Sequence, residues 1–444
     1  AADGSLHENV WRADGMYGAA IRQIVQMLSQ AIPYAENERQ QSVIRKLIEF
    51  YETGNLAVFD AYTILWVEET EGEVDFTNGF TEVYGDPLGL KASWEGYVNY
   101  TDHQATRRAQ ALSRNAQWFE DHSPVDARFK KPLCRGVSAK VINAAILGGD
   151  LYPSSAIGIN LPNSNWVRAE HGSKSVTIAN LTHAYDEAAR GNGFRNEFAD
   201  STQTVSLMDR YGSICDDLHT DLHECLGHGS GRLLPGVDPD ALKAYGSTIE
   251  EARADLFGLY YLADEKLVEL GLTPCQEAYK AQYYSYMMNG LLTQMVRIQP
   301  GHQIEEAHMR NRALIARWTL EHYPQAVRLS EQDGKHYVEI LDYPLLRTAF
   351  GNLLAEIQRI KSEGDLQAAR QMVERYGVQI DAKLHQEVLE RYSKLHLAPY
   401  KGFINPRYTP VCDSEGRITD VHIDYLETYD EQMLRYSKQY NTLI

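Results

Sequence analysis

The spacing of two histidines is the feature that most constrains this chain. His223 and His228 are five positions apart in a segment of helical character, and Glu224 follows the first of them. On a regular α-helix, residues five apart point about 140° away from each other, whereas residues four apart differ by only about 40°. The two rings can therefore face one point only if the helix absorbs an extra residue, in a π-bulge or a loosened last turn. Gly227 lies where such a deformation is easiest.

Two histidines beside a glutamate are typical of zinc sites, in which the imidazoles bind the ion and the glutamate acts as a general base. His219 and His223 form a competing pair that is four positions apart and needs no distortion. Spacing alone favours that pair, but Glu224 and an acidic motif downstream favour His223 and His228. Cys225 falls on the other side of the helix, so we interpret it as packing.

The acidic motif begins about twenty residues further along the chain. Thr248 is the expected N-cap of a long helix, and Glu251 and Asp255 share one face of it because they are four positions apart. In thermolysin-like zinc peptidases the third ligand is a glutamate on a later helix, and an acid four residues on holds a ligand histidine by its far nitrogen. We therefore expect one Zn²⁺, bound by His223, His228, Glu251 and a water molecule.

Helical periodicity dominates the remaining sequence. Helices are expected at 16–28, 39–51, 56–69 and 101–120, and again between 186 and 397, apart from a strand-like run at 336–341. Short β-like runs occur at 156–161 and 175–178, and residues 411–425 alternate like a hairpin. Turn signals predict a loop-rich segment at 76–89. The pattern predicts a mainly α protein with a small β component contributed by separate segments.

Composition limits the partners that we expect. A net charge of −18 argues against a nucleic-acid binder, which would carry a basic patch. The sequence has no run of eighteen apolar residues, so no membrane span is predicted. The five cysteines are widely spaced and contain no C-x-x-C pair, which is typical of reduced thiols. We expect a monomer in the cytoplasm.

The two motifs together resemble those of the dipeptidyl peptidase III family, which are H-E-x-x-G-H followed by E-E-x-R-A-E/D. Here they are residues 223–228, H-E-C-L-G-H, and residues 250–255, E-E-A-R-A-D. Three further segments resemble the family: 80–87 (F-T-E-V-Y-G-D-P), 158–163 (G-I-N-L-P-N) and 307–312 (A-H-M-R-N-R). The resemblance covers most of the chain.

The resemblance implies two lobes around a cleft, a helical zinc lobe and a lobe with a small β-barrel. Residues 1–100 would then belong to the lower lobe, 101–145 and 186–398 to the zinc lobe, 146–185 to a β-rich segment of the lower lobe, and 399–444 to a segment that returns to it. Proteins of this family are longer at the N-terminal end. We therefore expect this chain to be a fragment that lacks the N-terminal part.

The resemblance also implies an activity, the release of dipeptides from the free N-terminus of short peptides. The implied roles are catalysis for Glu224, His308 and Tyr84, substrate binding for Glu82, Asn160, Asn163 and Arg312, and support of the metal ligands for Glu250 and Asp255. Two alternatives remain open. One is a zinc endopeptidase on the same site, and the other is a peptide-binding module without catalysis.

Overall fold

The computed structural model describes residues 4–82, 92–134, 140–153, 155, 158–162, 164–172, 174–397 and 402–441. The chain divides into two compact units. Unit 1 consists of Ala1–His103, Lys140–Thr182 and Lys401–Ile444, and unit 2 of Gln104–Ala139 and His183–Tyr400. Both units are thus built from segments that are far apart in the sequence. The expected fold class, mainly α with a small β component, is confirmed.

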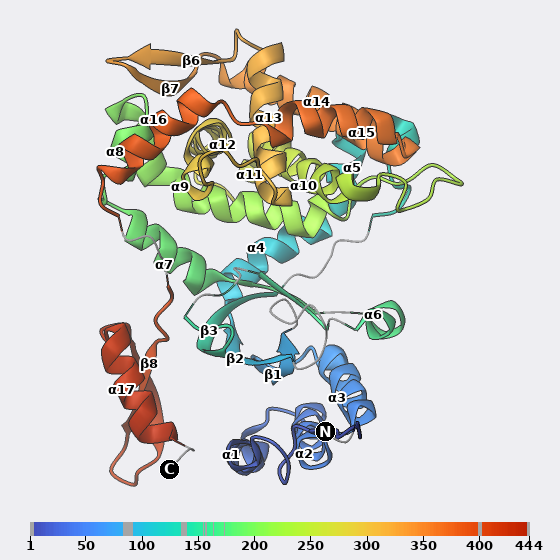
Figure 1. Ribbon diagram of the computed structural model, residues 1–444, viewed down its shortest axis with the longest axis vertical. Coiled ribbons are helices and arrows are strands. Elements are labelled where there is room, and N and C mark those ends of the chain that lie inside the picture. The colour runs from blue at the N-terminus through green and yellow to red at the C-terminus, as the bar shows by residue number, and fades with distance from the viewer. Residues whose placement is uncertain are drawn as a thin grey trace. The chain divides into compact units, whose positions relative to one another are not determined.

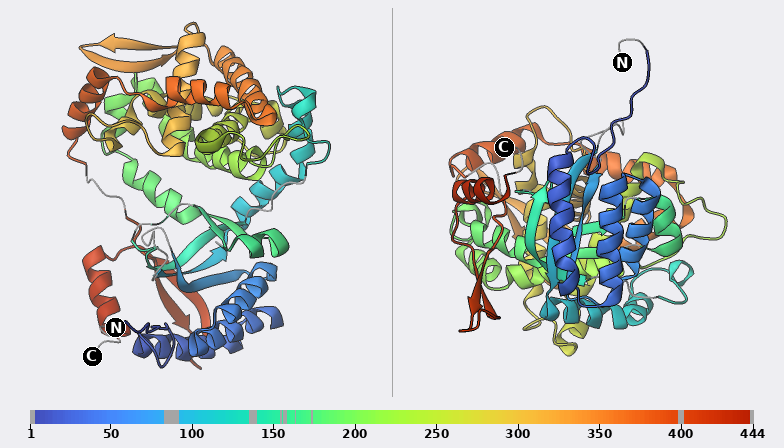
Figure 2. Two further views of the ribbon diagram at one scale, coloured as in Figure 1. Left: turned by 45° about the vertical axis from the view of Figure 1, so that its right-hand side comes forward. Right: turned by 90° about the horizontal axis from the view of Figure 1, so that it is seen from below.

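Unit 1 begins with three helices that pack side by side, α1 (Gly18–Ala31), α2 (Glu38–Thr53) and α3 (Leu56–Glu68) (Figures 1 and 2). Asn37 caps α2 by accepting a hydrogen bond from the Gln40 amide, and Asn55 caps α3 in the same way. Their buried faces meet in a cluster that includes Leu47, Tyr51 and Trp66. The three helices expected at 16–69 are confirmed.

The sheet of unit 1 has five strands: β1 (Val74–Glu82), β2 (Ser93–Thr101), β3 (Lys140–Gly149), β4 (Gly158–Leu161) and β5 (Lys174–Ile178). Their order is β1-β2-β3-β5-β4, with β3 and β5 parallel and the other neighbours antiparallel. A short helix, α6 (Asn165–His171), connects β4 to β5. The β-like run expected at 175–178 corresponds to β5, and the run expected at 156–161 corresponds to β4 over residues 158–161, since 156 and 157 lie outside the described residues.

The expected loop-rich segment at 76–89 is wrong for residues 76–82, which lie in β1; residues 83–89 are outside the described residues. The turn signal Asn78-Gly79 lies opposite β2 instead, and the register of the pair shifts between Gly79 and Glu82. A β-bulge absorbs an extra residue in this way, so turn-forming residues need not end a strand.

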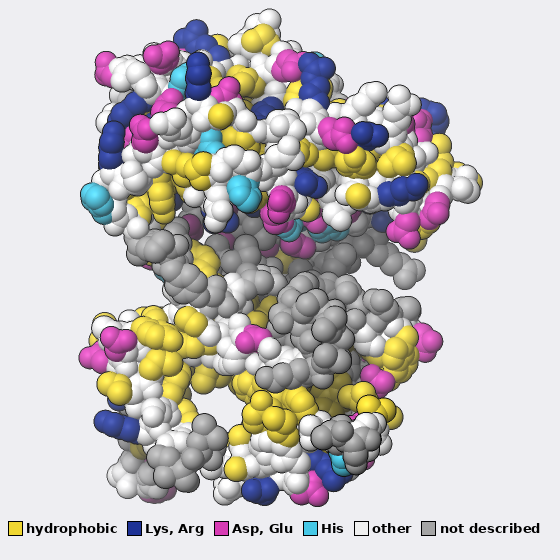
Figure 3. All heavy atoms as spheres, in the orientation of Figure 1, with side chains coloured by type: hydrophobic (Ala, Val, Ile, Leu, Met, Phe, Trp, Pro, Cys, Tyr) yellow, Lys and Arg dark blue, Asp and Glu magenta, His cyan; other side chains and the backbone are white. Residues whose placement is uncertain are grey.

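The last segment of unit 1 forms the expected hairpin, β8 (Arg407–Cys412) and β9 (Ile418–Asp424), followed by α17 (Tyr429–Tyr440). Asn405 joins this segment to β3, because its side chain exchanges two hydrogen bonds with the backbone of Leu147. Several large apolar side chains of the hairpin and α17 are exposed, and Figure 3 shows hydrophobic side chains on the surface there.

The described residues of unit 2 form helices and one hairpin, β6 (Val327–Gln332) and β7 (Lys335–Ile340). Its helices, of which α4 and α7 begin in unit 1, are α4 (His103–Arg114), α5 (Ala116–His122), α7 (Ala179–Ala189), α8 (Phe194–Phe198), α9 (Thr202–Leu222), α10 (Gly246–Leu262), α11 (Glu265–Glu269), α12 (Tyr279–Leu291), α13 (Ala307–His322), α14 (Tyr343–Glu363), α15 (Leu366–Met372) and α16 (Ala382–Ser393). None of the helices that the structure describes is both long and apolar enough to cross a membrane.

Helix α10 lies in the centre of unit 2, in contact with α9, α13 and α14 (Figure 1). Most of its residues are buried, as expected for a helix with apolar side chains on nearly all sides. The prediction that Thr248 is its N-cap is wrong. The helix begins at Gly246, directly after the 3₁₀ turn Lys243–Tyr245, and Thr248 is buried inside its first turns. No side-chain cap is needed where one helical turn runs into the next.

Candidate metal centre

The last turn of the helix that carries the two histidines is a π-helix. Helix α9 continues without a break into His223–Gly227, and the His228 amide donates to the His223 carbonyl over 3.0 Å, a bond that spans five residues. The predicted bulge is confirmed. We expected Gly227 to make the helix easier to distort, but the structure gives another reason for a glycine here. A β-carbon at this position would lie 2.9 Å from Ala254 Cα on α10. The glycine allows the two helices to approach each other.

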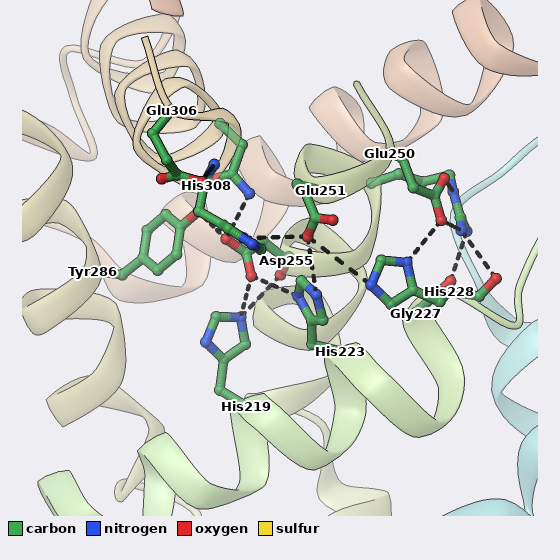
Figure 4. Close-up of polar contacts among 12 residues, drawn as sticks. His219, His223, Gly227, His228, Glu250, Glu251, Asp255, Tyr286, Glu306 and His308 are labelled. Atoms are coloured by element: carbon green, nitrogen blue, oxygen red, sulfur yellow. Dashed lines mark hydrogen bonds and ion pairs between the residues drawn. The ribbon is translucent and has the colours of Figure 1, made fainter. Parts of the chain in front are cut away.

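Three side chains converge at this point. His223 and His228 extend from the π-helix towards Glu251 on α10 (Figure 4). Glu251 Oε2 lies 3.2 Å from His223 Nε2 and 3.9 Å from His228 Nε2. One potential ligand atom from each residue lies within 4.8 Å of the others, and the described part of the chain holds no second group of this kind. The geometry is therefore that of a candidate site for one metal ion.

The far nitrogens of both rings bind carboxylates. His223 Nδ1 donates to Asp255 Oδ1 over 2.7 Å, and His228 Nδ1 donates to Glu250 Oε1 over 2.8 Å. With a proton on each Nδ1, Nε2 is the nitrogen of each ring that can bind a metal ion, and both Nε2 atoms face Glu251. The two carboxylates thus select the nitrogen of each ring that a metal ion would bind.

The competing histidine, His219, does not join the cluster. Its Nε2 donates to the Asp255 backbone carbonyl over 3.1 Å, and its Nδ1 accepts from Gln282 Nε2 over 3.2 Å. The ring lies so close to α10 that a β-carbon at Gly258 would be 2.5 Å from His219 Cδ2. His219 therefore packs against the helix that carries the acids.

Arg253 supports the His228 side of the site. It is fully buried, and its Nη1 donates to the Gly227 carbonyl over 2.7 Å. Its Nη2 donates to the His228 carbonyl over 3.2 Å and to Glu250 Oε1 over 2.6 Å. Lys361 binds the other oxygen of Glu250. Sequence analysis assigned no role to Arg253; its place three residues after Glu250 on the same helix was the available signal.

The charges around the cluster favour a cation. Burial raises the pKa of Glu250, Glu251 and Asp255, but neighbouring cationic and hydrogen-bonding groups outweigh it and leave each pKa below its usual value. Burial lowers the pKa of His223, but the hydrogen bond to Asp255 reverses this and the pKa is raised to about 10. Three ionised carboxylates therefore surround the two histidine rings.

The residues that are present fit a zinc ion. Glu251 Oε2 is buried and has no hydrogen-bond partner among the described residues, although His223 Nε2 lies 3.2 Å away. A buried carboxylate oxygen without a donor is unfavourable unless a cation binds it. Two imidazole nitrogens and one carboxylate oxygen are the donor set of many catalytic zinc sites.

The structure brings two more of the predicted site residues to the cluster. His308, at the start of α13, places Nδ1 3.4 Å from Glu251 Oε2. Arg312, one turn further along the same helix, is close enough that its charge contributes to the lowered pKa of Asp255. Glu224 is exposed on the π-helix beside His223.

The side chains of four residues predicted to bind substrate or to act in catalysis are not described by the structure. Tyr84 and Asn163 lie outside the described residues. Glu82 ends β1 and Asn160 lies in β4, but their side chains are not described. Their roles stay predictions.

The comparison with known proteins agrees with both motifs. The sequence profile of peptidase family M49 matches residues 4–243 and 239–393 of this chain. The chain belongs to peptidase family M49. The M49 match includes the histidine motif and the acidic motif, and it confirms the family that the sequence resembled.

Relatives of this M49 chain carry the name dipeptidyl peptidase 3. That of Dictyostelium discoideum is 27% identical over 62% of this chain and 43% of its own length. That of Homo sapiens is 24% identical over 95% of this chain and 60% of its own length. The solved structure of DPP III from Caldithrix abyssi matches with a TM-score of 0.70 and 21% identity, over 84% of this chain and 68% of that one. The chain thus spans about half the length of the curated relatives it matches.

Proposed function

We propose that this chain is a zinc-dependent exopeptidase that releases dipeptides from the free N-terminus of short peptides. The observation that supports it most is the convergence of His223, His228 and Glu251, with their ligand atoms within 4.8 Å, in a member of peptidase family M49. Relatives named dipeptidyl peptidase 3 support the exopeptidase activity. These three residues would hold the ion, and Asp255 and Glu250 would orient the two rings.

When bound, a zinc ion acts as a Lewis acid towards the scissile carbonyl and acidifies water. Glu224 is exposed beside His223, so its carboxylate is accessible to water and to a peptide. We assign it the general-base role, in which it takes a proton from the attacking water and returns it to the leaving amine. His308 lies beside Glu251 and can donate a hydrogen bond to the carbonyl oxygen as negative charge develops there.

The metal assignment is tested by the zinc content of purified variants. We expect Glu251→Ala and His228→Ala to lose zinc, because each removes a proposed ligand. Glu224→Ala should keep zinc but lose about 10²–10⁴ in rate, the usual contribution of general acid–base catalysis. Equal zinc content in Glu251→Ala and Glu224→Ala would contradict the division between ligand and base.

The exopeptidase assignment is tested with free and acetylated tetrapeptides on the wild type and Glu82→Gln. A free α-amine is largely cationic at neutral pH, since its pKa is about 7.7–8.0. If Glu82 binds it, acetylation should abolish cleavage, and Glu82→Gln should lower kcat/KM by about 10–100-fold. Equal cleavage of both peptides would favour the endopeptidase alternative. Zinc binding and peptide binding without hydrolysis would favour the non-catalytic one.

A further inference from the structure

Asp255, which accepts a hydrogen bond from His223, also accepts hydrogen bonds from other side chains. Asp255 Oδ1 accepts from His223 Nδ1, and Asp255 Oδ2 accepts from the Tyr286 hydroxyl over 2.7 Å and from Asn311 Nδ2 over 3.1 Å. These donors come from the π-helix, α12 and α13, whereas Asp255 belongs to α10. Figure 4 shows Tyr286 on the side of Asp255 that faces away from His228. Four elements therefore meet at one buried carboxylate.

An aspartate needs such support more than a glutamate would. Its side chain is one methylene shorter, so it reaches the His223 ring only when its backbone is correctly placed. His219 Nε2 donates to the Asp255 backbone carbonyl over 3.1 Å and thereby helps to place it. Tyr286 and Asn311 then determine the rotation of the carboxylate, because both of them bind Oδ2 and leave Oδ1 for His223.

Asn311 indicates that this support is more than packing. Its side chain is fully buried, and within the described residues its Oδ1 has no hydrogen-bond partner. A buried amide oxygen without a donor destabilises the fold, so an apolar residue would be expected here if only packing mattered. The hydrogen bond that Asn311 Nδ2 donates to Asp255 explains why an amide side chain occupies this position.

We propose that Tyr286 and Asn311 are positioning residues that act through Asp255 to hold His223 in the orientation that binds the metal ion. The inference rests on the proposed metal site. Neither residue is a ligand. Their contribution is the fixed direction of one carboxylate, and hence of the imidazole that donates to it.

Helix α12 offers a matched control. Tyr283 is buried like Tyr286, lies one turn before it, and also donates its hydroxyl to α10. Its acceptor is the Leu259 backbone carbonyl, at 2.7 Å, instead of a carboxylate behind a ligand. Tyrosine to phenylalanine at either position removes one buried hydroxyl with almost no change in shape. The two variants should therefore lose similar thermal stability if both hydroxyls serve only the fold.

The experiment measures zinc affinity of the metal-free protein by competition with a chelator, and records the visible spectrum of the cobalt-substituted protein. We expect Tyr286→Phe to weaken zinc binding about 10-fold, at the lower end of the range for groups that orient metal ligands. Its cobalt spectrum should change because the His223 ring is less well ordered. Tyr283→Phe should keep wild-type zinc affinity and the wild-type cobalt spectrum. Asn311→Ala, like Tyr286→Phe, should lower zinc affinity.

A double-mutant cycle tests whether the effect passes through Asp255. In an Asp255→Ala background, Tyr286→Phe should cause no further loss of zinc affinity. Unchanged affinity in Tyr286→Phe, an equal loss in Tyr283→Phe, or a full additional loss in the Asp255→Ala background would each overturn the inference while leaving the metal site intact. A wild-type protein that binds no zinc would instead overturn the proposed function, and the inference with it.

Discussion

The two histidines of the candidate metal centre have supports of opposite character. The carboxylate behind His228, Glu250, is bound by two cations, Arg253 and Lys361. The carboxylate behind His223, Asp255, receives its other hydrogen bonds from a phenol and an amide, which carry no charge. A carboxylate that two cations already neutralise transfers less negative charge to an imidazole than one with neutral partners. The same hydrogen bond should therefore strengthen His223 as a ligand more than His228.

The supports also differ in what they hold. Arg253 binds the backbone carbonyls of Gly227 and His228 at the end of the π-helix. Tyr286 and Asn311 bind only a side chain. The His228 side therefore stabilises the chain's path, and the His223 side mainly orients a ring. Each prediction below separates these two functions.

The largest effect is expected from Arg253→Met. Removing Arg253 breaks a buried ion pair with Glu250 and takes one donor away from the backbone carbonyls of Gly227 and His228, so the free energy of unfolding should fall by about 3–5 kcal/mol. Urea unfolding of the metal-free protein measures this. Arg391→Met is a matched control, because Arg391 is also buried in unit 2 and binds two glutamates and backbone carbonyls. It should lose similar stability and keep zinc affinity, whereas Arg253→Met should lose both.

The next effect compares the two carboxylates directly. Asp255→Asn should weaken zinc binding by about 10–100-fold, the range typical for groups that orient metal ligands. Glu250→Gln should weaken it less, because Arg253 and Lys361 already neutralise much of the charge that is removed. Chelator competition at one pH gives both values. A larger loss in Glu250→Gln would mean that the charge of Asp255 does not affect zinc affinity more strongly than the charge of Glu250.

A smaller effect on the metal is expected from His219→Ala. The loss of its hydrogen bond to the Asp255 carbonyl should lower stability by about 1–3 kcal/mol but zinc affinity only a few-fold. His385→Ala is the matched control, since His385 is also buried and donates to backbone carbonyls, those of Met295 and Ile298 instead of Asp255. Loss of zinc from His219→Ala, with zinc retained in His228→Ala, would show that the pair four residues apart is the real site.

The smallest effect, of opposite sign, is expected from Lys361→Met. Removing one of the two cations returns negative charge to Glu250, so zinc affinity should rise by about two- to five-fold, in line with a partly exposed ion pair. Lys280→Met is the control. Lys280 has a similarly exposed side chain (30%, against 31% for Lys361) and pairs with Glu277. A fall in affinity would indicate that Lys361 orients Glu250 instead of neutralising it.

Local features of the site could be predicted from the sequence. The π-helix followed from the five-residue step between His223 and His228, because helix geometry leaves few other ways to bring two rings together. Glu251 followed from its motif. The helices of unit 1 followed from their periodicity, but β1 was missed because Asn78-Gly79 has the composition of a turn and here lies in a strand, directly before a bulge.

The supports of the site could not be predicted in this way. Tyr286 and Asn311 lie 31 and 56 residues from Asp255 and reach it from other helices. Nothing in their local pattern distinguishes them from other buried residues of α12 and α13. Such contacts depend on how the helices pack against one another. Helix packing leaves no periodic signal in a single sequence.

The close approach of Gly227 to Ala254 has a consequence for which ion the site accepts. The two helices that carry the proposed ligands approach so closely here that a β-carbon on Gly227 would lie 2.9 Å from Ala254 Cα, so they have little room to move closer. Arg253, anchored on one helix and bonded to the end of the other, opposes their separation. The opening between the ligands therefore has a nearly fixed width. We expect selection by ionic radius, with an ion as large as cadmium bound only if the ligand side chains leave their preferred positions.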